Sequence, residues 1–194
     1  MPDENTTHNV HTPAYFVVSP WKLALMSFFS LGLYWWFCFH RHWVHQRRAT
    51  GDRIWPLARA LLLIFYLYPL LRRLDRDLVR AGLGRRWFPA ALFLPYLAVF
   101  ICQIYSGLVV EVIDPIWFLP FVIVANAVMI GVEVKLQLAA NLLAGDPQGT
   151  QNSRLTWANW IWMTPGLFLW GVIVLSVAAS LMLRLLLVVI SWIQ

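Results

Sequence analysis

Charged side chains are scarce in this sequence. Asp, Glu, Lys and Arg make up 12% of its 194 residues, about half the share typical of a globular protein, whereas hydrophobic residues make up 60%. The mean hydropathy is +0.65. A chain this apolar is solvated mostly by lipid, so the composition predicts an all-α bundle of membrane helices, with one domain over residues 15–194.

Cysteine is scarce as well. Cys38 and Cys102 both lie in apolar runs, so a disulfide framework has no support. Residues 1–14 lack the basic start and the short apolar core of a signal peptide. We expect them to form a disordered tail, and we expect the first apolar run to stay in the mature protein.

The sequence lacks the common catalytic motifs. It contains no Gly-x-Ser-x-Gly, no His-Glu-x-x-His and no glycine-rich phosphate loop, so we predict a protein that is not an enzyme and has no cofactor. Cys38, His42 and His45 recur at helical spacing and are residue types that bind zinc or copper. Arginines surround them and oppose a bound cation, so we predict no metal site.

Long apolar runs are what the sequence does have. We predict four transmembrane helices, at residues 21–39, 87–110, 116–132 and 165–187. The last begins at Pro165 because proline and glycine there interrupt a charge-free run that is too long for one straight span.

Basic residues are unevenly distributed between these spans. Residues 40–53 hold four arginines, whereas residues 1–14 hold none and the acidic turn with Glu111 and Asp114 holds none. The positive-inside rule places the tail and the turn outside and the arginines in the cytoplasm. A version in which the first apolar run is also re-entrant, leaving three spans, stays open.

The apolar run Ala60 to Leu71 is too short to cross. Its 12 residues would cover roughly 18 Å of a hydrocarbon core of about 30 Å. We therefore predict a re-entrant or interfacial hairpin over residues 54–71. Leucines then recur at helical spacing among arginines, which predicts an amphipathic helix over residues 70–81 lying on anionic lipid.

Arginines near this hairpin are the candidate binding residues for a lipid headgroup or a protein partner. They are Arg59, Arg72, Arg73, Arg76, Arg80, Arg85 and Arg86. Arg59 precedes the apolar segment and could bind phosphate or a carboxylate beneath the membrane surface. The alternative is that its side chain extends to the headgroups.

Polar residues also recur at i+4 beyond the third span. Glu133, Gln137 and Asn141 would form a polar stripe on one helix face. The stripe could hold a lipid headgroup or a partner helix; the alternative is a solvated helical extension. Asn126, inside the span, is expected to hydrogen-bond within the bundle.

The opening of the chain carries a further pattern. It consists of Ser19-Pro-Trp-Lys22-Leu23, Met26-Ser27, Gly32-Leu33-Tyr34, Trp36 and Trp43. This pattern resembles the opening of a group of small bacterial inner-membrane proteins without a known activity. Short matches to that group follow at Pro56, Arg59-Ala60, Gln137, Asn141, Asn159-Trp160, Gly166 and Trp170. The chain departs from it where Trp35-Trp36 and a His/Arg tail replace Tyr-Trp and Lys. The resemblance implies a bacterial inner-membrane protein and brings no activity with it.

These observations predict a non-enzymatic interaction, sensing or immunity component of the bacterial inner membrane. It would engage anionic lipid or a protein partner through its basic cytoplasmic face, and it would form homo-oligomers. We attribute the net charge of +6 to that face and not to nucleic acid binding. The alternative is a small transporter or channel that uses the discontinuous segment from Pro56 to Pro69. Arg59, Asn126 and Gln137 in one water-filled cavity would favour transport.

Overall fold

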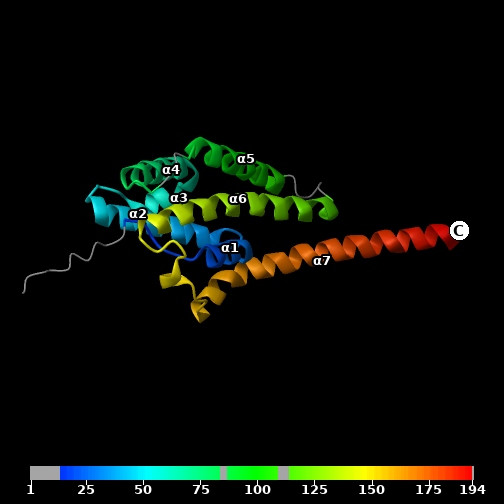
Figure 1. Ribbon diagram of the computed structural model, residues 1–194. Helices are drawn as coiled ribbons and strands as arrows, with labels where there is room; N and C mark the ends of the chain where they lie inside the picture. The colour runs from blue at the N-terminus through cyan, green and yellow to red at the C-terminus, as the bar shows by residue number, and fades with distance from the viewer. Residues whose placement is uncertain (1–13, 84–86, 109–113, 194) are drawn as a thin grey trace, which may run out of the picture.

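The computed structural model describes residues 14–83, 87–108 and 114–193, and every regular element within them is helical. An all-α fold is therefore confirmed (Figure 1). In order along the chain the elements are α1 (Pro20–Phe29), α2 (Leu33–Thr50), α3 (Pro56–Leu61), α4 (Leu63–Arg80), α5 (Pro89–Leu108), α6 (Pro115–Leu143), the 3₁₀ turn η2 (Thr150–Asn152) and α7 (Trp157–Ile193).

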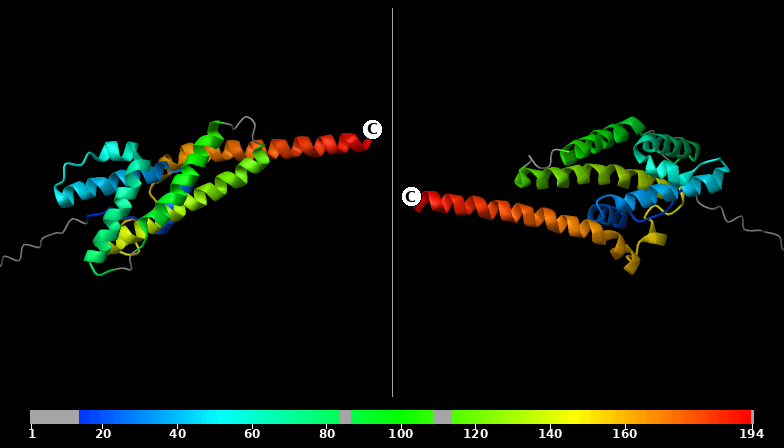
Figure 2. Two further views of the ribbon diagram at one scale, coloured as in Figure 1. Left: turned by 90° about the horizontal axis from the view of Figure 1, so that it is seen from above. Right: turned by 180° about the vertical axis from the view of Figure 1, so that it is seen from behind.

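Three of these helices are long and apolar enough to cross a membrane: Pro89–Leu108, Ile116–Leu143 and Trp157–Ile193. α5 packs beside α6, and α7 contacts α6, lies oblique to it and projects well beyond both (Figures 1 and 2). The C-terminal half of α7 is exposed on all sides, as a helix surrounded by lipid would be. The described residues therefore hold three candidate spans, one fewer than predicted.

The helix predicted at residues 21–39 is broken in two. α1 ends at Phe29, and Leu31 and Gly32 then adopt positive φ angles of 50° and 84° before α2 begins. α1 alone has ten residues, a length of roughly 15 Å, which is half of a hydrocarbon core. The prediction of one continuous span here is wrong, because the chain turns at Gly32.

The hairpin predicted at 54–71 and the amphipathic helix predicted at 70–81 have different boundaries. α3 ends at Leu61, and α4 then runs without interruption from Leu63 through Pro69 to Arg80. One helix therefore contains half of the predicted hairpin and nearly all of the predicted amphipathic segment.

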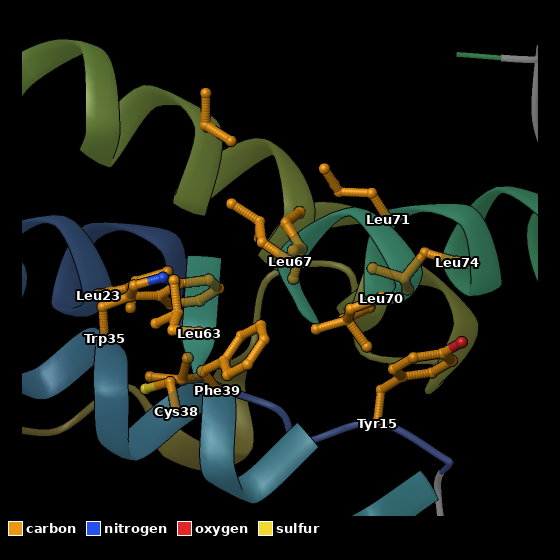
Figure 3. Packing of buried hydrophobic residues seen from close by; sticks show 14 of the residues in the cluster. Tyr15, Leu23, Trp35, Cys38, Phe39, Leu63, Leu67, Leu70, Leu71 and Leu74 are labelled. Atoms are coloured by element: carbon orange, nitrogen blue, oxygen red, sulfur yellow. The ribbon is translucent and has the colours of Figure 1, made fainter. Parts of the chain in front are cut away.

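The apolar face of α4 lies in the protein core. Its buried residues are Leu63, Leu67, Leu70, Leu71, Leu74 and Leu78. Figure 3 shows α4 leucines gathered with Trp35 and Phe39 of α2 in one cluster. The helical spacing of these leucines was read correctly, but the surface that covers them is protein instead of lipid.

α7 continues through the proline that was expected to start it. The helix begins at Trp157, and Pro165 lies inside it. Gly166 matters for packing instead: a Cβ there would lie 2.0 Å from the carbonyl oxygen of Phe29, so only glycine allows α7 to approach the end of α1 this closely. Trp170 reinforces the contact by donating from its indole Nε1 to the Phe28 carbonyl at 3.0 Å.

Candidate functional site

The polar stripe of α6 is buried inside the protein. Gln137 and Asn141 are fully buried and Glu133 is 2% exposed, so the solvated alternative is wrong. Gln137 donates to the main-chain oxygen of Phe16 at 2.8 Å and to the Asn141 Oδ1 at 2.8 Å. Asn141 in turn donates to the Val18 carbonyl at 2.9 Å and accepts from the Val18 N–H at 3.4 Å. Two residues of the stripe thus hold an extended segment of the chain's own N-terminal part.

That segment, residues 14–19, is anchored from several elements at one end of the molecule. Gln46 near the end of α2 donates to the Ala14 carbonyl, and the Tyr15 hydroxyl donates to Asp77 of α4 at 2.7 Å. The Ser19 N–H donates to the carbonyl of Asn152 in the loop before α7. The segment therefore lies at the end of the bundle that carries basic residues of α2 and α4. Residues 1–13, the rest of the predicted outer tail, lie outside the described residues.

The loop from Ala144 to Arg154 supports this end of the molecule. Asp146 accepts hydrogen bonds from the main chain of Thr150 and Gln151, and these donors lower the pKa of its carboxyl below the usual range. Lys22 at the start of α1 donates to the Asn152 side chain at 2.8 Å and to the Arg154 carbonyl at 2.7 Å. The turn residues predicted this loop correctly, and it carries structural contacts.

His42 is a structural residue of the core. Its Nε2 lies 3.2 Å from the Gln137 Oε1, and burial lowers the pKa of His42 to about 3, so the ring is neutral near pH 7. In the described part of the chain no three His, Cys, Asp or Glu side chains come together as metal ligands do. The Cys38, His42 and His45 spacing therefore does not assemble a metal site there.

Arg59 lies against aromatic rings. Its guanidinium carbon is 4.1 Å from the ring centre of Trp43 and 5.1 Å from that of Tyr66, which is cation–π geometry. The Gln137 side chain lies within hydrogen-bond distance of the Phe16 carbonyl and of His42, whereas Asn126 lines a pocket among α1, α5 and α6. The single cavity with Arg59, Asn126 and Gln137 that would have favoured transport is not formed.

A basic groove lies between α4 and the start of α5. It has a volume of about 530 Å³ and is lined by Tyr68, Arg72, Asp75, Arg76, Val79, Arg80, Trp87, Phe88 and Pro89. The structure brings Arg72, Arg76 and Arg80 to this groove from successive turns of one helix. Arg73 does not join them: it forms an ion pair with Asp52 at 3.2 Å. Arg85 and Arg86 lie outside the described residues.

A second pocket lies among α1, α5 and α6. It has a volume of about 260 Å³, and its polar lining residues are Ser27, Gln103, Ser106, Asn126 and Glu133. An adjoining pocket of about 300 Å³ also reaches Glu133 and is bordered by Leu61, Leu62 and Leu63 at the break between α3 and α4. Sequence reasoning placed Glu133 in the stripe and missed Ser27, Gln103 and Ser106. The spacing of Asn126 and Glu133, seven residues apart on one helix, is a sequence pattern that could have indicated this shared polar face, but the prediction did not use it.

At the start of α6, the Asp114 side chain caps the helix by accepting a hydrogen bond from the Ile116 N–H at 3.0 Å. Its second oxygen forms an ion pair with Arg184 of α7. Glu111, the other acidic residue expected in this turn, lies outside the described residues. The paired Asp114 and Arg184 place that level of α7 beside the start of α6.

The motif resemblance of the opening segment stays a prediction, because comparison with other proteins adds nothing to it. The chain matches no protein-family model, no curated protein and no solved structure.

Proposed function

We propose that this chain is a non-enzymatic inner-membrane protein that binds anionic lipid headgroups in the groove between α4 and α5. The observation that carries the proposal is the groove itself, where Arg72, Arg76 and Arg80 face Trp87 and Phe88. Guanidinium groups bind phosphate through several N–H donors, and aromatic rings favour the depth at which headgroups meet acyl chains.

The position of α4 supports this proposal. Its leucine face is fixed in the core, so the opposite arginine face cannot rotate away from the groove. Pro89 begins α5, the first membrane-crossing candidate, directly beside these arginines. The groove therefore lies at the level where the chain enters the membrane, which is where lipid phosphates are found.

The proposed topology has three crossings, by α5, α6 and α7. The α1–α2 pair enters from the cytoplasmic side, turns at Gly32 and returns, so residues 14–19 and the arginines of α2 and α4 share the cytoplasmic face. The hydrogen bonds from Asn141 and Gln46 to residues 14–19 support it. Basic segments remain inside in this arrangement, as the positive-inside rule requires. A protein partner on the same basic face, within a sensing or immunity role, and assembly into homo-oligomers are also part of the proposal.

The test is lipid selectivity of the full-length protein in detergent, measured by native mass spectrometry. Phosphatidylglycerol and phosphatidylcholine are added in equal amounts, and the bound ratio is compared for the wild type and the variant R72Q/R76Q/R80Q. At about 1 kcal/mol per arginine, the three changes are expected to weaken phosphatidylglycerol binding roughly a hundredfold.

A matched control removes the same kind of charge elsewhere. Arg47 and Arg48 are exposed at the end of α2, so R47Q/R48Q should keep the preference for phosphatidylglycerol. An unchanged ratio in the triple variant, or an equal loss in the control, would show that the groove is not the binding site.

One observation favours a second function, that of a small transporter. The break between α3 and α4 at Leu62 borders the pocket that reaches Glu133, as a discontinuous helix borders a transport site. This segment lies within the predicted Pro56 to Pro69 element, although the ionisable residue in the pocket is Glu133 of α6 and not Arg59.

A further inference from the structure

Glu133 is a buried carboxylate beside a polar pocket at membrane depth. It is 2% exposed, and among the described residues its Oε2 has no hydrogen-bond partner. The Ser27 side chain lies next to this carboxylate and is 1% exposed, and its hydroxyl oxygen has no other partner among the described residues. A buried carboxylate with only a neutral hydroxyl beside it costs free energy, most of all in a membrane protein, so this pair requires an explanation.

We infer that the pocket bounded by Ser27, Asn126 and Glu133 binds a single alkali cation, with Glu133 as its charged ligand. The inference is independent of the lipid groove and concerns the second function. The binding step is reversible coordination, and no covalent bond forms or breaks.

The oxygen atoms of the side chains that line the pocket favour a hard cation. The polar lining consists of carboxylate, hydroxyl and amide groups, and oxygen ligands of this kind suit hard cations. Asn126 uses its amide N–H to bond the Val122 carbonyl at 2.8 Å, so the amide oxygen is the end available to a ligand. Ser106 donates its proton to the Gln103 carbonyl at 2.9 Å, which leaves its oxygen as an acceptor.

Charge decides between a monovalent and a divalent ion. Among the described residues that line the pocket, Glu133 is the only acidic one and none is basic. One positive charge on the ion therefore gives a neutral site, whereas a divalent ion would leave a net charge in a medium of low dielectric constant. The groups that face Glu133 from neighbouring helices are the Cys38 thiol of α2 and the Tyr96 hydroxyl of α5, and burial keeps both uncharged.

The shape of the pocket supplies a route to the carboxylate. Its lining follows α6 from Phe118, one turn after the start of the helix, to Glu133. Phe118 and Glu133 are fifteen residues apart, which corresponds to roughly 22 Å along a helix, most of the thickness of a hydrocarbon core. Asn126 lies midway, so an ion that moves along this groove from the outer end meets a polar group before it reaches Glu133.

The experiment measures thermal unfolding of the full-length protein in detergent at pH 9, where Glu133 is most readily ionised. Sodium chloride or potassium chloride is titrated against N-methylglucamine chloride at constant ionic strength. The alkali salt should raise the unfolding midpoint of the wild type by several degrees with a saturating dependence, because a ligand that binds only the folded state stabilises it. Lowering the pH should raise the half-saturating concentration, by up to tenfold per unit, since a proton competes for the same carboxylate.

Variants make the inference falsifiable. Glu133→Gln should abolish the response. Ser27→Ala should raise the half-saturating concentration about tenfold, and it provides a second test in case the glutamine variant is too unstable to purify. Asp52→Asn removes a surface carboxylate that lines neither pocket at Glu133, and it should respond as the wild type does. A wild type that responds to pH but not to sodium or potassium would mean that Glu133 binds only a proton, and it would overturn the inference. A full response in Glu133→Gln would overturn it too, and neither result would affect the lipid groove.

Discussion

Asn141 holds a main-chain segment that lies 123 residues away in the sequence. Its amide group accepts from the Val18 N–H and donates to the Val18 carbonyl, both in a fully buried setting. Substitution by leucine keeps a side chain of similar length but removes both partners. Each unsatisfied main-chain group costs about 1–3 kcal/mol, so the loss of both partners in Asn141→Leu should lower the free energy of unfolding by about 2–6 kcal/mol.

The change is measurable with a thiol-reactive dye. Cys38 is fully buried, so in a Cys102→Ala background its labelling reports unfolding. Lys135 is exposed on the same helix, and Lys135→Ala is the control that should leave stability within about 0.5 kcal/mol of the parent. Equal stabilities for the two variants would contradict the account of residues 14–19.

Spacing alone identified the stripe but could not identify its partner. Glu133, Gln137 and Asn141 share a helix face because they are four residues apart, and this much was predictable. What they contact depends on how residues 14–19 return to the end of α6, which is a long-range arrangement. The same limit applies to Arg59, whose aromatic neighbours Trp43 and Tyr66 come from two other helices.

At the scale of elements, the packing of α7 on α1 depends on the absence of one side chain. In Gly166→Ala the new Cβ would meet the Phe29 main chain, which cannot rotate away as a side chain could. The helices must separate, so we expect a loss of about 1–3 kcal/mol in the free energy of unfolding, and more if the Trp170 hydrogen bond breaks as well.

The same helix offers a matched control. A Cβ at Gly171 would meet nothing within 4 Å, so Gly171→Ala should be neutral or should stabilise by up to about 1 kcal/mol through helix propensity. The dye assay measures both variants. A Gly166→Ala protein as stable as Gly171→Ala would show that α1 and α7 are not in close contact in the membrane.

Helix positions were predictable to a large extent, and helix breaks were not. Apolar runs located α5 and α6, because a span must be long and uncharged. The break at Gly32 was missed because a glycine in an apolar run is compatible with either a helix or a turn, and only the positive φ angle distinguishes them. Pro165 was taken as a helix start, although neighbouring packing lets α7 continue through it.

At the scale of the whole molecule, composition predicted the membrane and arginines predicted the inner face. Orientation rules assume that each long apolar run crosses, so the first run was counted as a span. In the structure α1 packs against α2, α6 and α7, and α2 packs against α3. The segment before α1 returns to the basic end. In the proposed topology this run does not cross, so the N-terminal segment lies on the cytoplasmic face and every other assignment is unchanged.

The most direct test of this arrangement is labelling of single cysteines in intact bacterial cells with an impermeant maleimide. The protein carries Cys38→Ala and Cys102→Ala, and the probes are Ala14→Cys, Ala49→Cys, Gln148→Cys and Asp114→Cys. We predict that Asp114→Cys reacts in intact cells and that the other three react only after permeabilisation. Labelling of Ala14→Cys in intact cells, with Ala49→Cys protected, would mean that the first apolar run crosses the membrane and would contradict the account.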